Sequence, residues 1–296
     1  MLVTAVVAVL GIVGFACVHA IDADGAPSSA ISVVTAKSAV TTDAEVATAT
    51  KTYYLTAGGL KRSYEVIAPV TALPKSAPII VMLSGIDATV AQEISRDRLV
   101  NYASADKAEI VYPVAFDESW NATGCCGKAA ADGVNDLAFL KALVAKVNPK
   151  NVRHIYLVGY SNGARMAYRV ACDAPSLFEE YAMVKGLATA DCPISKPVSI
   201  VAMASLNDPE VAYNPGVTTQ VAQLRAAEKC PAKSATLHSG QMTLTTWSGC
   251  ADGTRLALAA WSGGVHSFPR PPASVPAAAQ VLWSFFTKTP LAPLPA

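Results

Sequence analysis

Residues 154–158 read His-Ile-Tyr-Leu-Val and run directly into residues 159–163, Gly-Tyr-Ser-Asn-Gly. The first segment is a short apolar run, typical of a strand buried on both faces of a parallel sheet. The second has the pattern G-x-S-x-G, and the spacing of residues 164–172 is helical. A strand, a sharp turn and a helix in this order expose the Ser161 hydroxyl at the top of a sheet. The backbone N–H of Asn162 then points to where an oxyanion would form.

Further apolar segments on both sides of this turn extend the pattern. We predict strands at residues 62–68, 78–83, 109–113, 197–204 and 255–260, and a helix over residues 132–147. Strands that alternate with helices indicate an α/β fold, with a mostly parallel central sheet and crossover helices on both of its faces.

A nucleophilic serine needs a base and a group that orients the base. In this architecture the acid and then the histidine follow the serine in the chain. Asp208 comes just after the strand predicted at 197–204, and His266 follows the strand at 255–260. We therefore predict Asp208 as the acid and His266 as the base. The remaining candidates are the acids Asp191, Asp252 and Glu210 and the histidines His19, His154 and His238.

Composition and charge exclude several classes of protein. The chain has 296 residues, of which 52% are hydrophobic and 15% charged, so it can bury a large core and is not mostly disordered. A net charge of +1 gives no electrostatic footprint for nucleic acid. We also expect no stable membrane partner, unless the chain is lipid-anchored, and we expect a monomer.

The N-terminal region is typical of an exported protein. Residues 1–20 contain no Asp, Glu, Lys or Arg and end in Val-His-Ala, which predicts a signal peptide, with a membrane anchor or a lipid-modified Cys17 as alternatives. Residues 21–50 predict a flexible low-complexity linker, residues 51–287 the folded domain, and residues 288–296 a proline-rich tail that leaves the domain. Each alternative places the domain outside the cytoplasm, and we expect secretion. The six remaining cysteines are an even number, which favours disulfides in such a compartment.

Several segments resemble the secreted esterases of the polyhydroxybutyrate depolymerase and feruloyl esterase group, within the α/β-hydrolase fold. The likeness runs from about residue 60 to residue 286 and is carried by the segments 60–64, 80–85, 124–127, 134–140, 158–166, 247–250 and 263–269. It is most specific in the Ser-Asn-Gly-x-x-Met of residues 161–166 and the Cys-Cys-Gly of residues 125–127. By this likeness, Ser161, Asp208 and His266 fall on the catalytic positions of the family.

Three positions depart from the family pattern. Ser84 stands where the family usually has histidine, in the loop that gives the second oxyanion N–H, and we expect Ile86 or Asp87 to donate it. Residues 204–205 are Ala-Ser where the family often has His-Gly, and Phe268 replaces a common tryptophan. The departures allow altered specificity or reduced activity.

The resemblance and the residues together predict an ester hydrolase. We expect it to act on a small or oligomeric ester through a Ser-Asp-His triad and an acyl-enzyme, with no metal and no organic cofactor. A depolymerase of short polyesters is the alternative within this class, and a catalytically silent binding protein on the same fold is the alternative outside it. We place Trp120 at the acyl pocket, the alternative being ordinary packing within its loop.

Disulfide pairing follows from the expected proximity of the cysteines in the fold. Cys172 ends the helix after the G-x-S-x-G turn, and Cys192 lies in the loop after the next apolar segment. Cys230 and Cys250 flank a hairpin-like polar stretch, and Cys250 matches a cysteine of the family. We predict the pairs Cys172–Cys192 and Cys230–Cys250. The adjacent residues 125 and 126 then form either a vicinal disulfide or two thiols.

Overall fold

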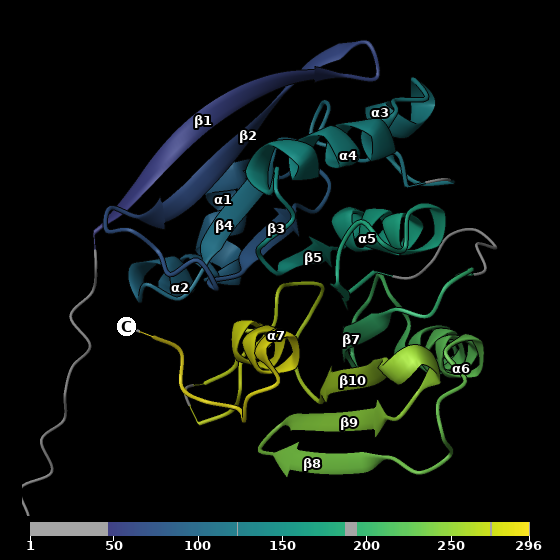
Figure 1. The fold of residues 1–296 in the computed structure, drawn as a ribbon. Coiled ribbons are helices and arrows are strands. Elements are labelled where there is room, and N and C mark those ends of the chain that lie inside the picture. Colours follow the sequence, from purple (N-terminus) through teal and green to yellow (C-terminus); the bar gives the residue numbers. More distant parts are fainter. Residues whose placement is uncertain (1–46, 123, 187–193, 273, 296) are drawn as a thin grey trace, which may run out of the picture. The chain divides into compact units, whose positions relative to one another are not determined.

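One sheet organises the fold, in the strand order β1-β2-β4-β3-β5-β6-β7-β10-β9-β8 (Figure 1). We analysed a computed structural model that describes residues 47–122, 124–186, 194–272 and 274–295. The ten strands are β1 Thr48–Ala57, β2 Leu60–Pro69, β3 Ile79–Leu83, β4 Glu109–Pro113, β5 Ile155–Tyr160, β6 Glu180–Val184, β7 Ser199–Ser205, β8 Ala235–Ser239, β9 Met242–Ser248 and β10 Arg255–Trp261. From β4 to β10 across the sheet the neighbours are parallel, and the two outer pairs at each edge are antiparallel.

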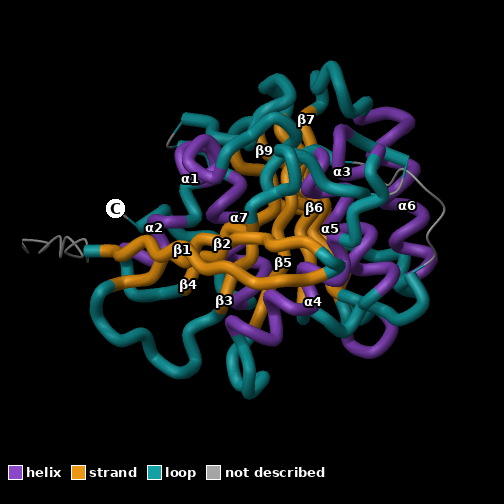
Figure 2. The backbone as a smooth tube through the Cα atoms, turned by 90° about the horizontal axis from the view of Figure 1, so that it is seen from above, coloured by secondary structure: helices purple, strands orange, loops and turns teal. Residues whose placement is uncertain are grey.

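Helices cover both faces of this sheet, as expected from the sequence. They are α1 Val90–Asp97, α2 Val100–Ser104, α3 Gly127–Ala131, α4 Asp136–Val147, α5 Asn162–Asp173, α6 Thr218–Ala227 and α7 Ala278–Thr287, with single turns at Tyr213–Val217 and Ala251–Gly253. In Figures 1 and 2, α4, α5 and α6 lie on one side of the strands, and α1, α2 and α7 lie on the other.

The continuous apolar strands supply two separate core layers. In β3, Ile79, Val81 and Leu83 belong to one buried cluster, which also holds side chains of α4, α5 and α6. Ile80 and Met82 point the other way, into the cluster that holds side chains of α2 and α7. Successive side chains of a strand alternate between faces, so a strand covered on both sides must be apolar at every position.

The structure corrects the predicted limits of the domain and of one helix. β1 begins at Thr48, inside the predicted linker, because it pairs along its whole length with β2. The rest of the predicted linker and signal peptide lies outside the described residues, apart from Ala47. The predicted helix 132–147 begins only at α4, where the side chain of Asn135 accepts a hydrogen bond from the Ala138 N–H and caps the helix.

The C-terminal residues return to the domain instead of leaving it. Leu291 and Leu294 pack against the second core cluster. Gln280 Nε2 donates to the Ala292 carbonyl at 2.7 Å, and Asn101 Nδ2 donates to the Pro295 carbonyl at 2.9 Å. The prediction of a separate tail is therefore wrong for residues up to 295, because two leucines between the prolines pack against the second core cluster.

Candidate active site

Ser161 lies at the turn between β5 and α5, on strained backbone. Its φ of 53° and ψ of −115° fall outside the regions that non-glycine residues favour. Two glycines make the turn possible, because a Cβ on Gly159 would collide with the backbone of Gly163, and one on Gly163 would collide with the carbonyls of residues 83 and 84. The serine hydroxyl is thereby held at the end of the central strand.

The structure brings the three predicted residues together, although 105 positions separate Ser161 from His266. His266 Nε2 lies 2.9 Å from Ser161 Oγ. His266 Nδ1 lies 3.0 and 3.1 Å from the two carboxylate oxygens of Asp208. The ring is thus placed between a hydroxyl and a carboxylate, in the order that a general base requires.

The backbone fixes the Asp208 carboxylate. Its Oδ1 accepts hydrogen bonds from the N–H groups of Glu210 and Val211, at 2.9 and 3.0 Å. Burial alone would raise the pKa of Asp208, but these two donors and the neighbouring His266 outweigh burial and lower it. The carboxylate therefore stays ionised beside the imidazole at neutral pH.

The other candidate acids and histidines that the structure describes do not take the place of Asp208 or His266 beside Ser161. Asp252 is exposed in the turn between β9 and β10, and Asp191 is outside the described residues. Glu210 Oε2 lies 3.6 Å from His266 Nε2, on the Ser161 side of the ring, and its side chain is 66% exposed. His154 pairs with an exposed glutamate and His238 with a threonine of the edge hairpin.

One residue at this centre has no counterpart in the sequence predictions. Lys185, which follows β6, is 2% exposed, and its Nζ lies 3.7 Å from Asp208 Oδ2 and donates to the Val265 carbonyl. Burial lowers the pKa of Lys185, and its contact with Asp208 opposes this shift. The ammonium joins the acid to the loop that carries His266. A lone lysine after an apolar segment gives no sequence signal for this position.

Two backbone N–H groups beside Ser161 are free to receive an oxyanion. Asn162 is the first residue of α5, so its N–H has no acceptor within the helix. The Asp87 N–H donates to the Glu118 carbonyl at 3.0 Å and is occupied. Among the described residues, the Ile86 N–H has no acceptor, and the preceding Gly85 packs so closely that a Cβ there would lie 3.5 Å from the Ser161 Cβ. Of the two predicted donors, the geometry therefore favours Ile86.

The Trp120 side chain lies in the core. Its side chain is fully buried, stacks on Phe139 and donates from Nε1 to the Ser84 carbonyl at 3.1 Å. Its backbone N–H and carbonyl pair with the side-chain amide of Asn162 at 2.7 and 3.1 Å. The prediction that Trp120 binds substrate is therefore wrong, because the loop turns the indole into the core. The residue instead connects the loop that holds Ile86 to the start of α5.

The cysteines pair largely within the predicted scheme. Cys230 and Cys250 form a disulfide, which confirms that prediction. Cys125 and Cys126 are joined as a vicinal disulfide, one of the two alternatives left open. Cys192 lies outside the described residues, so its pairing with Cys172 stays a prediction.

No cluster of three or more His, Cys, Asp or Glu side chains in the described part of the chain could hold a metal ion. In the same residues, no helix combines the length and the apolar character needed to cross a membrane.

Sequence comparison finds relatives that are named as esterases. A protein named as the esterase NocK, of Nocardia uniformis subsp. tsuyamanensis, is 29% identical in an alignment 188 residues long that covers 59% of this chain and 53% of that protein. A protein named as feruloyl esterase C, of Aspergillus terreus, is 24% identical over 53% of this chain and 60% of its own length. The chain thus spans little more than half the length of these curated relatives. No family model matches the chain.

Solved structures show the same fold at low sequence identity. An acetyl xylan esterase from Aspergillus awamori superposes with a TM-score of 0.57 at 13% identity, over 74% of this chain and 95% of that one. A protein described as a dienelactone hydrolase, from Klebsiella pneumoniae, gives a TM-score of 0.55 at 14% identity, over 82% of this chain and 99% of that one. The chain has the α/β-hydrolase fold, as the sequence predicted.

Proposed function

We propose that the protein is a serine esterase that hydrolyses carboxylic esters through an acyl-enzyme on Ser161. The observation that carries the proposal is the hydrogen-bonded series from Ser161 Oγ through His266 to Asp208, on a strained turn beside two free N–H groups. The likeness to proteins named as esterases supports the same chemistry.

The geometry supports a two-step reaction. His266 Nε2 takes the proton of Ser161 Oγ as the oxygen attacks the ester carbonyl, and Asp208 stabilises the imidazolium that results. The N–H groups of Asn162 and Ile86 stabilise the tetrahedral oxyanion. His266 then returns the proton to the leaving alkoxide. In the second step it activates a water molecule, which releases the acid and restores Ser161.

We further propose a type of ester hydrolase and secretion from the cell. The resemblance in sequence favours a feruloyl-esterase-like or polyhydroxybutyrate-depolymerase-like ester hydrolase, and the disulfides Cys230–Cys250 and Cys125–Cys126 support secretion. The triad residues need no metal or organic cofactor for this chemistry.

Hydrolysis of p-nitrophenyl acetate and butyrate by the purified protein tests the proposal. Ser161→Ala removes the nucleophile, and we expect kcat to fall about 10⁶-fold, with an unchanged circular dichroism spectrum. A phosphonate inhibitor should add its mass to a peptide containing Ser161 and to no peptide of the variant. A folded wild-type protein that neither hydrolyses these esters nor takes up the phosphonate would instead be a silent binding protein, and Ser161→Ala with wild-type activity would refute the mechanism.

A further inference from the structure

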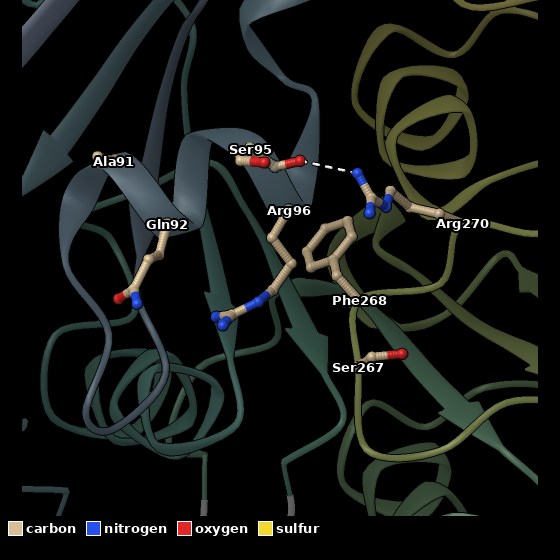
Figure 3. Close-up of a pocket in the computed structure, with 7 residues that line it drawn as sticks. All are labelled: Ala91, Gln92, Ser95, Arg96, Ser267, Phe268 and Arg270. Atoms are coloured by element: carbon tan, nitrogen blue, oxygen red, sulfur yellow. Dashed lines mark hydrogen bonds between the residues drawn. The ribbon is translucent and has the colours of Figure 1, made fainter.

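A pocket of about 650 Å³ lies beside the catalytic residues, between α1 and the loop that carries His266 (Figure 3). Its polar and aromatic lining comes from Gln92, Ser95 and Arg96 of α1 and from Ser267, Phe268 and Arg270 of the loop. Ser267 and Phe268 follow His266 directly in the chain, so the pocket opens at the catalytic loop itself.

A second contact joins the pocket to the nucleophile turn. The Arg96 guanidinium lies over the ring of Tyr160, 5.1 Å from its centre, and Tyr160 precedes Ser161. The Tyr160 ring lies 5.6 Å from the His266 ring, and its hydroxyl donates to the His266 carbonyl at 3.0 Å. The Tyr160 ring thus contacts both Arg96, which lines the pocket, and the His266 ring.

The lining presents positive charge and hydrogen-bond donors. Arg96 is fixed on one side, because its Nη1 donates to the buried Glu93 carboxylate at 2.9 Å. Arg270 Nη1 donates to the Ser95 carbonyl at 2.8 Å, and no carboxylate of the described residues pairs with it. None of the lining residues is acidic, and Glu210 is not among them.

The pocket lining keeps a net positive charge. Glu93 offsets Arg96, whereas Arg270 has no offsetting partner in the described part of the chain, and Arg98 shares a neighbouring pocket with it. In the view of Figure 3 the Phe268 ring lies between the side chains of Arg96 and Arg270, and the two guanidinium groups point to opposite sides of this ring. A guanidinium group binds a planar carboxylate through charge-assisted hydrogen bonds.

We propose that this pocket binds a free carboxylate of the substrate, so that the protein prefers esters that carry an ionised acid group near the scissile bond. The inference rests on the proposed esterase function and names the substrate class of that site. Half-esters of dicarboxylic acids place the carboxylate on the acyl side, and acylated hydroxy acids place it on the alcohol side. Arg270 is the anion contact, because its charge has no carboxylate partner among the described residues.

Paired substrates test the proposal on each side of the ester bond. The p-nitrophenyl half-ester of succinic acid is compared with p-nitrophenyl butyrate, and 4-acetoxybenzoate is compared with phenyl acetate. We expect kcat/KM to be about tenfold higher for the charged ester of one pair, since a charge-assisted contact contributes on this scale. The pair that shows the preference identifies the side on which the carboxylate is bound.

Arg270→Gln is the decisive variant, because among the described residues the one hydrogen bond of this exposed side chain goes to the Ser95 carbonyl. We expect it to raise KM for the preferred charged ester about tenfold, with kcat within about twofold and the uncharged partner unchanged. Arg225→Gln removes the same charge from an exposed position of α6 and should change neither substrate.

The outcomes distinguish a failure of the pocket assignment from a failure of the esterase proposal. Uncharged esters hydrolysed without any preference for a carboxylate, or a preference that survives Arg270→Gln, would overturn the pocket assignment alone. A wild-type protein that hydrolyses none of the four esters would overturn the esterase proposal and the pocket assignment together.

Discussion

The contact between Lys185 and Asp208 permits a quantitative prediction. The two charged groups are 3.7 Å apart, and each side chain is 1% exposed. Coulomb's law with an effective dielectric constant of about 20 gives about 4 kcal/mol for such a pair. Desolvation of the ammonium offsets part of this attraction, so we expect a coupling free energy of about 2 kcal/mol.

A double-mutant cycle in urea denaturation measures this coupling. Asp208→Asn leaves a buried ammonium without its carboxylate, and we expect it to lower the free energy of unfolding by about 3 kcal/mol. Lys185→Met should cost about 2 kcal/mol, because it also removes the hydrogen bond to the Val265 carbonyl. The double variant should cost about 3 kcal/mol instead of the sum of the two.

We expect the same substitutions to affect activity and stability differently. Asp208→Asn should lower kcat about 10⁴-fold, and the double variant should stay equally inactive, because only the carboxylate holds the His266 tautomer. The matched control is the exposed pair formed by Lys128 of α3 and Asp132, which follows α3, and its cycle should show no coupling that the assay resolves. Additive effects of Lys185→Met and Asp208→Asn within about 0.5 kcal/mol, or activity restored in the double variant, would refute the reasoning.

Three further predictions concern the surroundings of the site. Trp120→Phe removes the donor to the buried Ser84 carbonyl and should lower the free energy of unfolding by about 1 to 3 kcal/mol, which thermal denaturation at matched pH would show. Replacing Cys230 and Cys250 together by serine opens a loop with a sequence separation of 20 and should cost about 3 kcal/mol in the same assay, whereas an unchanged Tm would contradict the pairing. Folding lowers the pKa of Asp208. The ionised carboxylate therefore stabilises the folded state fully above the ordinary carboxyl pKa, and this stabilisation is lost as the pH falls through the lower pKa of the folded state. Urea unfolding at pH 5 and pH 3 should show a larger loss of stability for the wild type than for Asp208→Asn.

The sequence predicted those features that short-range sterics and chain order control. Strand β5 and the Ser161 turn have a local signature, because only glycine fits where the strand and helix backbones meet. Asp208 and His266 were predicted to lie beside Ser161, as they do in the structure, because the order of the strands fixes which loops reach the end of β5. These predictions needed no knowledge of side-chain packing.

The features that the sequence did not predict depend on tertiary neighbours. Lys185 has no distinguishing pattern, since the burial of its ammonium is compensated by groups 23 and 80 positions away, Asp208 and the Val265 carbonyl. An aromatic residue in a loop can face the solvent or the core, and only the packing against Phe139 decides this for Trp120. β1 alternates poorly because it lies at the sheet edge and most of it is exposed.

The order of the last strands bears on how the catalytic centre is assembled during folding. β8, β9 and β10 pair with one another in sequence as an antiparallel meander, and only β10 joins them to the parallel strands, through β7. The loop that follows β10 carries His266, so His266 reaches Ser161 only when β10 pairs with β7. A local opening between β7 and β10 would separate His266 from Ser161 while the strands from β1 to β7 remain paired. The hydrolysis rate would then measure whether β7 and β10 are paired, and it would fall before the rest of the sheet unfolds.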